Sequence, residues 1–160
     1  MKQILISIKP KWVAKILRGE KTLEIRKTAP KELPCEVFIY CTKNGEQISR
    51  GTLRGVLKPL NGKVVAKFTL NKVDKFFYFD DDEICVPACL DRGSVLDYLG
   101  DNDGYAWHIS DLEIFNDPKD LEKFDYPNPS GIANVSQSSI KGLPNKKHPP
   151  QSWCYVEELL

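Results

Sequence analysis

The sequence lacks any long, uninterrupted run of apolar residues. Its most apolar stretch near the start, M-K-Q-I-L-I-S-I-K-P over residues 1–10, is broken by Ser7 and Lys9. Such a run is too short and too interrupted for a signal peptide or for a membrane-spanning helix. We therefore expect a cytoplasmic protein with no membrane partner.

Cysteine is present, but not in the pattern that a disulfide-stabilised protein requires. The five cysteines are an odd number without dense, regular spacing, so we expect reduced thiols. Cys85 and Cys89 lie four residues apart, and His108 or His148 is available to extend them toward a metal site. Because zinc sites usually contain two close pairs of ligands and the second pair is missing, we expect no metal and no cofactor.

Strong net charge is also missing, although the charges are unevenly distributed along the chain. The formal net charge is +1, yet residues 1–72 hold 16 Lys and Arg against 5 acids, and residues 73–160 hold 7 against 17. One interpretation is a basic surface that meets a polyanion. The other is that the two halves neutralise each other across the fold. With 160 residues, of which 41% are hydrophobic, the chain is expected to form a single domain spanning residues 1–160.

The stretch G-E-K-T-L-E-I-R, residues 19–26, combines alternation with polar chemistry. Leu23 and Ile25 are predicted to point to one side of a strand, and Thr22, Glu24 and Arg26 to the other. Such a row of donors and acceptors can read a planar polar ligand. It can equally be a solvated sheet face that contains a Glu24 to Arg26 ion pair.

The remaining pattern favours strands over helices. Alternating apolar residues predict strands at 4–8, 36–42, 63–79 (one bent strand or two), 104–115 and 151–160. Short helices are predicted after Pro10, at 94–99 and at 118–124, with a turn-rich loop or ragged hairpin at 43–61 and a long surface loop at 126–150. These elements predict a mainly β (α+β) fold, a small mixed β-barrel with two or three peripheral helices.

Residues 9–26 contain the pattern K-P-x-W-x-x-x-I-x-x-G-x-K-T-x-E-x-R, which resembles the opening of ASCH domains, members of the PUA-like superfamily. Y-A-W-H-I at 105–109, P-x-x-L-x-x-F at 118–124 and P-P-Q-S-W-C-Y-V-E at 149–157 are similar to the longer bacterial and phage members. The resemblance spans nearly the whole chain. It implies a PUA-like β-barrel with a cleft beside the G-E-K-T-L-E-I-R strand that handles RNA or a nucleotide-like ligand.

Some small relatives are amidohydrolases that deacetylate acetylcytidine with a lysine and a threonine of this motif. In this sequence the lysine corresponds to Lys21, but the nucleophilic threonine corresponds to Glu24. A hydroxyl can form a covalent acyl intermediate, whereas a carboxylate is better suited to act as a base or to accept hydrogen bonds. We therefore do not transfer the amidohydrolase activity to this chain.

The leading hypothesis is a binding module for RNA or a nucleotide. Lys9, Lys21 and Arg26 are predicted to contact phosphate, and Glu24 is predicted to read a base or sugar edge. The full set of predicted ligand-binding residues is Lys9, Lys21, Thr22, Glu24, Arg26, Tyr40, Trp107, Gln151, Ser152 and Trp153, in which an aromatic ring stacks on the base. One alternative is a hydrolase of a modified nucleoside or of RNA, with Lys21 and Glu24 catalytic. Another is a phage-type small-ligand sponge or protein-interaction domain.

Overall fold

The computed structural model describes residues 1–51, 54–125 and 148–159. Its strands are β1 (Lys2–Ile8), β2 (Leu23–Arg26), β3 (Cys35–Cys41), β4 (Ser49–Gly51), β5 (Leu57–Pro59), β6 (Val64–Leu70), β7 (Val73–Phe76), β8 (Gly104–His108), β9 (Ser110–Lys119), β10 (Phe124–Asp125) and β11 (Trp153–Glu158). Its helices are α1 (Pro10–Leu17), α2 (Val86–Ala88) and α3 (Arg92–Leu99), with a π-helical turn η1 (Asp81–Cys85) and a 3-10 turn η2 (Leu121–Lys123).

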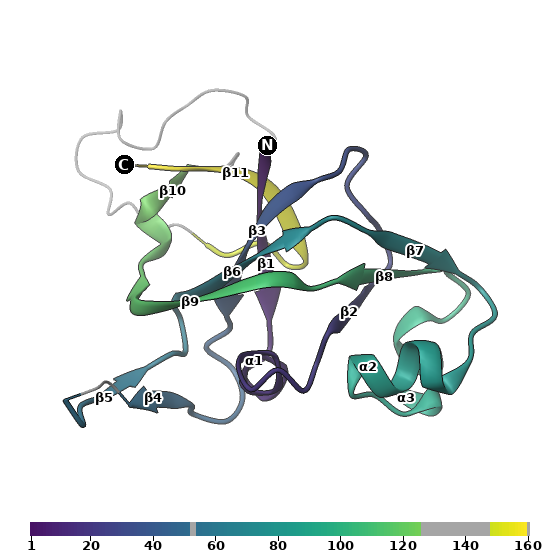
Figure 1. Ribbon diagram of the computed structural model, residues 1–160, viewed down its shortest axis with the longest axis horizontal. Helices are drawn as coiled ribbons and strands as arrows, with labels where there is room; N and C mark the ends of the chain where they lie inside the picture. Colours follow the sequence, from purple (N-terminus) through teal and green to yellow (C-terminus); the bar gives the residue numbers. More distant parts are fainter. Residues whose placement is uncertain (52–53, 126–147, 160) are drawn as a thin grey trace.

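A mixed six-stranded sheet forms the centre of the molecule, in the order β10-β11-β1-β3-β6-β9 (Figure 1). β1 pairs in parallel with β3 and antiparallel with β11, so the two ends of the chain are neighbours in the sheet. A second sheet has the order β2-β8-β7. The mainly β fold with a mixed sheet and peripheral helices is therefore confirmed.

The segment from Gly104 to Lys119 joins the two sheets, because its first part is β8 and its second part is β9. Between them, the amide of Ile109 donates to the carbonyl of Thr22 at 3.0 Å. Among the described strands, the ladders leave both sheets open at their edges rather than closing them into one ring. The two sheets nevertheless share a core, since Trp107 of β8 packs in one cluster with the apolar side chains of β1 and β3.

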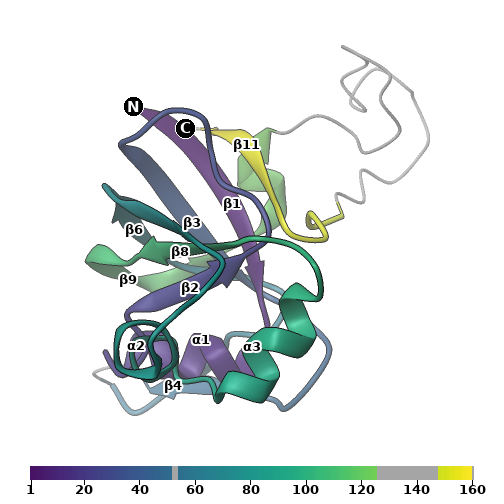
Figure 2. The same ribbon diagram turned by 90° about the vertical axis from the view of Figure 1, so that its right-hand side faces the viewer.

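The central sheet is buried on both faces, as the apolar character of β3 predicts. One face, with Val37 and Ile39, packs against Trp107 and the α1 helix. The opposite face, with Phe38 and Tyr40, packs against side chains of β9, η2 and β10. A third cluster holds Leu23, Ile25 and Ala106 of the smaller sheet against η1, α2 and α3. The three helices lie together below the sheets in Figure 2.

Several boundaries differ from those predicted. β2 begins only at Leu23, and the residues at 63–79 form two strands, β6 and β7. The predicted helix at 118–124 is a strand end followed by the short turn η2, while Asp91 caps α3 by accepting from the Ser94 amide at 2.8 Å. The predicted hairpin at 43–61 contains the β4–β5 ribbon. Most of the predicted 126–150 loop lies outside the described residues.

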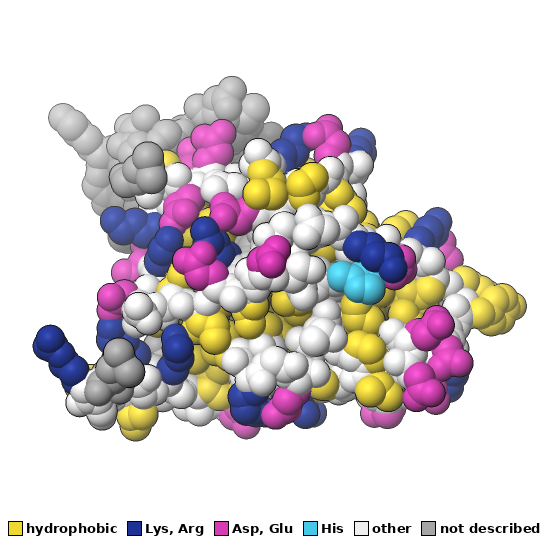
Figure 3. Space-filling model, viewed as in Figure 1, with side chains coloured by type: hydrophobic (Ala, Val, Ile, Leu, Met, Phe, Trp, Pro, Cys, Tyr) yellow, Lys and Arg dark blue, Asp and Glu magenta, His cyan; other side chains and the backbone are white. Residues whose placement is uncertain are grey.

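Several ion pairs connect the basic half of the sequence with the acidic half. Lys58 pairs with Asp117 and Lys63 with Asp120, each joining the basic half to the acidic half. Lys67 makes a similar pair with Glu113 at 3.4 Å. The interpretation that the halves neutralise each other is therefore confirmed for these residues. Basic side chains still gather over the β4–β5 ribbon, at the lower left of Figure 3.

No helix in the described part of the chain is long and apolar enough to cross a membrane.

Glu36 links three neighbouring strands and is expected to make stability depend on pH. Burial raises the pKa of its carboxyl, but hydrogen bonds from Lys67 (2.9 Å) and Gln3 (2.8 Å) outweigh burial and lower the pKa overall. A lowered carboxyl pKa stabilises the fold above the unfolded-state value, and this contribution is lost as the pH falls through the folded-state pKa. We expect Glu36→Gln to lower the free energy of unfolding by about 1 to 3 kcal/mol at neutral pH and by much less near pH 2. Urea unfolding at both pH values measures this.

The control for Glu36 is Glu32→Gln, because Glu32 forms an exposed ion pair with Lys2. Exposed pairs contribute little, so this variant is expected to unfold like the wild type at both pH values. Equal effects of the two substitutions at neutral pH would show that the Glu36 contacts do not stabilise the fold.

The five cysteines are free and differ in exposure. Cys35, Cys41 and Cys85 are buried, and Cys89 and Cys154 are half-buried. Burial raises the pKa of Cys41 to about 12 and that of Cys154 to about 11. Because the thiolate is the reactive form, we expect iodoacetamide to modify Cys89 first in the folded protein at mildly alkaline pH. Mass spectrometry of tryptic peptides measures the order, and modification of Cys41 as fast as Cys89 would contradict it.

Candidate functional site

The turn after α1 determines where the polar residues of the motif lie. Gly19 ends the helix with φ of 76°, a left-handed conformation that glycine adopts without strain. The amide of Lys21 then donates to the Lys15 carbonyl at 3.2 Å, and that of Thr22 donates to the Pro87 carbonyl at 2.8 Å. These bonds fix Lys21 and Thr22 ahead of β2 rather than within it.

β2 shows the alternation that the sequence predicted. Leu23 and Ile25 pack into the core toward the helices, so Glu24 and Arg26 lie on the other face. The prediction that Thr22 belongs to the same strand is wrong, because β2 begins after it. Thr22 is exposed at the edge of the site.

Lys21, Glu24 and Arg26 form one buried charged group, which we call the Lys21–Glu24–Arg26 cluster. The Lys21 Nζ lies 3.3 Å from Glu24 Oε2, and the Arg26 guanidinium lies 3.0 Å from Glu24 Oε1. The three residues are only 2%, 7% and 7% exposed, respectively. The predicted Glu24 to Arg26 pair therefore exists, but the predicted solvated face does not.

Backbone groups complete the cluster. Lys21 donates to the carbonyl of Ala88 at 2.6 Å, and Arg26 donates to the carbonyl of Ser7 at 2.7 Å. The cluster nevertheless contains two cations and one carboxylate. Because buried charge is stable only when it is paired, this excess of positive charge makes the cluster a favourable neighbour for an anion.

The end of the chain closes one side of the cluster. Arg26 donates to the hydroxyl of Ser152 at 3.1 Å, across 126 positions of sequence. Ser7 holds the same segment, since its amide donates to the Ser152 carbonyl at 2.9 Å and its hydroxyl to the Pro150 carbonyl at 2.6 Å. The structure thus joins the predicted motif to the predicted terminal Q-S-W segment.

Two tryptophans of the predicted site meet beside the cluster. The rings of Trp107 and Trp153 pack edge to face, with centroids 5.5 Å apart. Both indole N–H groups donate to Thr28, that of Trp107 to the carbonyl at 3.1 Å and that of Trp153 to the hydroxyl at 3.0 Å. Trp107 is completely buried and Trp153 is half-buried, so only Trp153 presents surface to a ligand.

Tyr40 does not belong to this site. Its side chain is 1% exposed and packs in the apolar cluster on the opposite face of the central sheet. Burial there raises the pKa of its hydroxyl. The alternation along β3 explains this position, because Ile39 and Cys41 occupy the face toward α1. Its predicted stacking role is therefore not favoured by the geometry.

Other predicted residues surround the cluster at the surface. Lys9 is exposed and lies two positions after Ser7, whose carbonyl binds Arg26, and Gln151 is exposed next to Ser152. The half-buried Trp12 lies over the cluster, with its ring centroid 5.3 Å from Lys21 Nζ, a cation–π contact. Trp12 also packs against the edge of the apolar core.

The sequence did not reveal a second polar pair on β7 and β8. The Nε2 of His108 lies 2.7 Å from Asp74 Oδ2, and Lys72 lies 3.0 Å from the same oxygen. Burial raises the pKa of Asp74, but these two partners outweigh burial and lower the pKa overall. His108 and Asp74 are 34 positions apart, so no local spacing in the sequence predicts the pair.

Within residues 1–51, 54–125 and 148–159, no group of three or more His, Cys, Asp or Glu side chains is arranged to hold a metal ion. Cys85 is instead buried, with its thiol 3.5 Å from Asp81.

Comparison with known proteins places this geometry in context. No protein-family model matches the sequence, and no curated protein matches it. The crystal structure of ASCH from Zymomonas mobilis is 21% identical with a TM-score of 0.60, and the match covers 98% of this chain and 88% of that one. A tyrosine-to-phenylalanine variant and a serine-to-alanine variant of that protein match with 20% identity, TM-scores of 0.60 and coverage of 91% and 89% of their chains. This chain therefore has the fold of an ASCH domain.

Proposed function

We propose that this chain is an ASCH protein that binds RNA or a nucleotide at the Lys21–Glu24–Arg26 cluster. One observation supports the proposal above others: two buried cations share a single carboxylate beside the surface. A phosphate next to Arg26 balances the extra charge. The general association of the PUA-like superfamily with RNA, which the ASCH fold implies, agrees with this ligand class.

The surroundings of the cluster suit a nucleotide better than a simple anion. The half-buried Trp153 supplies an aromatic ring for a base, and the exposed Lys9 adds a positive charge to those of Lys21 and Arg26. Base stacking contributes about 1 to 3 kcal/mol, and lysine contacts to phosphate make affinity depend on salt. Glu24, as an acceptor, fits the amino edge of a base.

Hydrolysis is less well supported by the same geometry. Glu24 would have to take a proton from water, but each of its carboxylate oxygens already lies within 3.3 Å of a cation. We therefore propose recognition rather than catalysis, with Lys21 and Glu24 as ligand-binding residues.

Lys9→Gln tests the proposal without disturbing the buried cluster. We expect weaker binding of fluorescein-labelled single-stranded RNA. We also expect the slope of log K against log salt concentration to be less steep by about 0.7, because one phosphate contact is lost. Fluorescence anisotropy over a series of salt concentrations measures both quantities. Unlabelled nucleotides as competitors then determine whether a single nucleotide is sufficient.

Lys2→Gln is the matched control, since it removes the same charge from a lysine that pairs with Glu32 at 3.1 Å. This variant is expected to bind like the wild type. If the wild type binds neither RNA nor any nucleotide at low salt, or if both substitutions weaken binding equally, the proposed site is wrong.

A further inference from the structure

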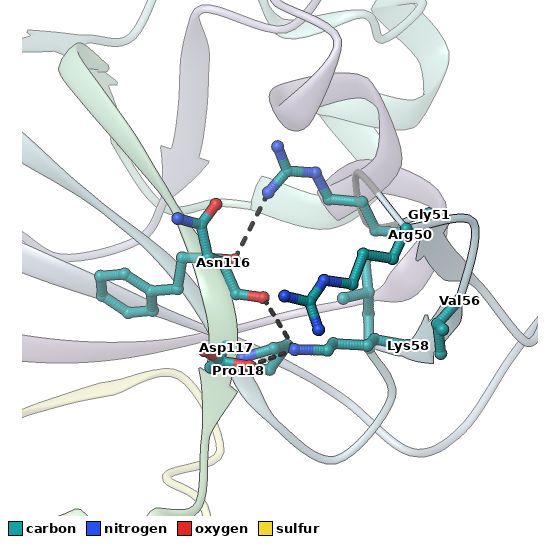
Figure 4. Close-up of a pocket in the computed structure, with 10 residues that line it drawn as sticks. Arg50, Gly51, Val56, Lys58, Asn116, Asp117 and Pro118 are labelled. Carbon is teal, nitrogen blue, oxygen red and sulfur yellow. Dashed lines mark hydrogen bonds and ion pairs between the residues drawn. The ribbon is translucent and has the colours of Figure 1, made fainter.

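A cavity of about 730 Å³ lies away from the Lys21–Glu24–Arg26 cluster, between the β4–β5 ribbon and β9 (Figure 4). Arg50, Arg54 and Lys58 line it from the ribbon side, and the segment Phe115–Pro118 lines it from the β9 side. Binding sites for small organic ligands usually measure about 300 to 1,000 Å³. The cavity is therefore large enough for a molecule the size of a nucleotide.

The charge of the cavity wall is strongly unbalanced. Its three basic side chains face one carboxylate, Asp117, which is already paired with Lys58. Among the described residues, Arg50 and Arg54 have no carboxylate partner. The wall thus presents two cations whose charge no acidic side chain of the described chain balances.

The ribbon places two of these cations where they repel each other. Arg50 of β4 lies directly opposite Lys58 of β5 in the antiparallel register. Like charges directly opposite each other on paired strands destabilise a ribbon. Asp117 pairs with Lys58 and relieves part of this repulsion, and an anion next to Arg50 and Arg54 relieves the rest.

The existing contact of Arg50 is weak enough to be exchanged, whereas Lys58 is also held by its ion pair with Asp117. Arg50 donates to the Phe115 carbonyl at 3.4 Å and Lys58 to the Asn116 carbonyl at 3.3 Å, both longer than a typical N–H···O bond. Charged hydrogen bonds from arginine to phosphate are shorter and stronger. Figure 4 shows the basic side chains reaching across the cavity toward β9.

The base of the cavity is apolar. Leu60 and Phe115 are 3% and 8% exposed and line the wall together with Pro118 and the more exposed Val56. A wall that combines cations with apolar surface suits an organic anion, since the phosphate meets the cations and the ring or sugar meets the apolar side chains. Inorganic phosphate alone leaves the apolar part unused.

From this geometry we infer that the cavity between the β4–β5 ribbon and β9 is a second ligand site, which binds a phosphate-bearing organic anion of nucleotide size through Arg50, Arg54 and Lys58. The ligand is either a free nucleotide or one nucleotide unit within an RNA chain. The inference goes beyond the proposed function and stands on different residues.

Titration of the ¹⁵N-labelled full-length chain distinguishes the two sites by nuclear magnetic resonance. The probes are inorganic pyrophosphate, nucleoside monophosphates and triphosphates, and a single-stranded RNA oligomer. We expect chemical-shift changes at the amides of residues 49–51 and 115–117 with a nucleotide or with the RNA. A response to nucleotides identifies a free ligand, and a response to RNA alone identifies a unit of the chain.

Arg54→Gln and the double variant Arg50→Gln, Arg54→Gln are expected to weaken this binding by about tenfold and more than tenfold, because arginine contacts to phosphate are lost. Lys2→Gln, which changes a lysine at neither site, should leave these shifts unchanged. Unchanged shifts at the ribbon and β9 with every probe overturn the inference, as does equal binding by the double variant. Shifts confined to the Lys21–Glu24–Arg26 cluster overturn it while leaving the proposed function intact, and shifts confined to the cavity do the reverse.

Discussion

Glu24→Gln is expected to lower the free energy of unfolding by about 3 to 5 kcal/mol, because it leaves two buried cations without a carboxylate. Lys21 and Arg26 are 2% and 7% exposed, so water cannot replace the lost negative charge. Both cations lie within 3.3 Å of Glu24 and are brought together by it. Chemical denaturation followed by circular dichroism measures the loss.

Glu20→Gln is the matched control for this prediction. Glu20 pairs with Arg18 at 2.8 Å, but the two side chains are 48% and 57% exposed. An exposed pair contributes between about 0 and 1 kcal/mol, so Glu20→Gln should be nearly neutral. Equal losses for the two variants would show that burial does not strengthen the dependence on Glu24.

The same variant also probes the anion preference of the cluster. Without Glu24 the cluster carries two positive charges, so phosphate is expected to stabilise Glu24→Gln more than it stabilises the wild type. Melting temperatures measured with and without phosphate provide the comparison. An identical phosphate response in Glu24→Gln, wild type and Glu20→Gln would argue against an anion site at Arg26.

Local periodicity was sufficient to predict the chemistry of β2 but not its burial. The alternation of Leu23 and Ile25 with Glu24 and Arg26 is a property of four consecutive residues, and the strand preserves it. Whether the polar face meets water depends on residues far along the chain. Ser7 and Ser152 cover Arg26, and no spacing within residues 19–26 predicts that contact.

The positions of the aromatic residues were also only partly predictable from the sequence. Tyr40, Trp107 and Trp153 were predicted from the sequence as candidates to stack on a base, but the sequence could not assign each ring to a face of the fold. Tyr40 lies on the far side of the central sheet, because β3 is covered on both faces. Of these three rings, Trp153 alone is half-buried rather than buried, and it lies beside the Lys21–Glu24–Arg26 cluster.

The cavity between the β4–β5 ribbon and β9 could not be predicted from the sequence. Residues 43–61 are turn-rich, and no pattern within them distinguishes Arg50 or Lys58 as part of a site. Their position in the cavity wall depends on the register that places them opposite each other and on the approach of β9. In a hairpin the register follows from the turn, but the approach of a distant strand depends on tertiary packing, which local sequence does not specify.

Trp107→Ala is expected to destabilise the protein by about 3 to 5 kcal/mol, because it empties the contact between the two sheets. The side chain is completely buried among residues of β1, β3 and α1, and its indole N–H donates to the Thr28 carbonyl at 3.1 Å. Trp107→Phe keeps part of the ring volume and should cost less. Unfolding by guanidinium, followed by circular dichroism, ranks the variants.

Trp153→Ala is expected to give the opposite balance of effects. Trp153 is half-buried and packs edge to face on Trp107 at 5.5 Å, so its removal costs less stability than that of Trp107. If its exposed surface stacks on a base, RNA affinity should fall by about 5-fold to 150-fold, equivalent to about 1 to 3 kcal/mol. Undiminished RNA binding by Trp153→Ala would remove the stacking role and leave Trp12 as the remaining aromatic beside the cluster.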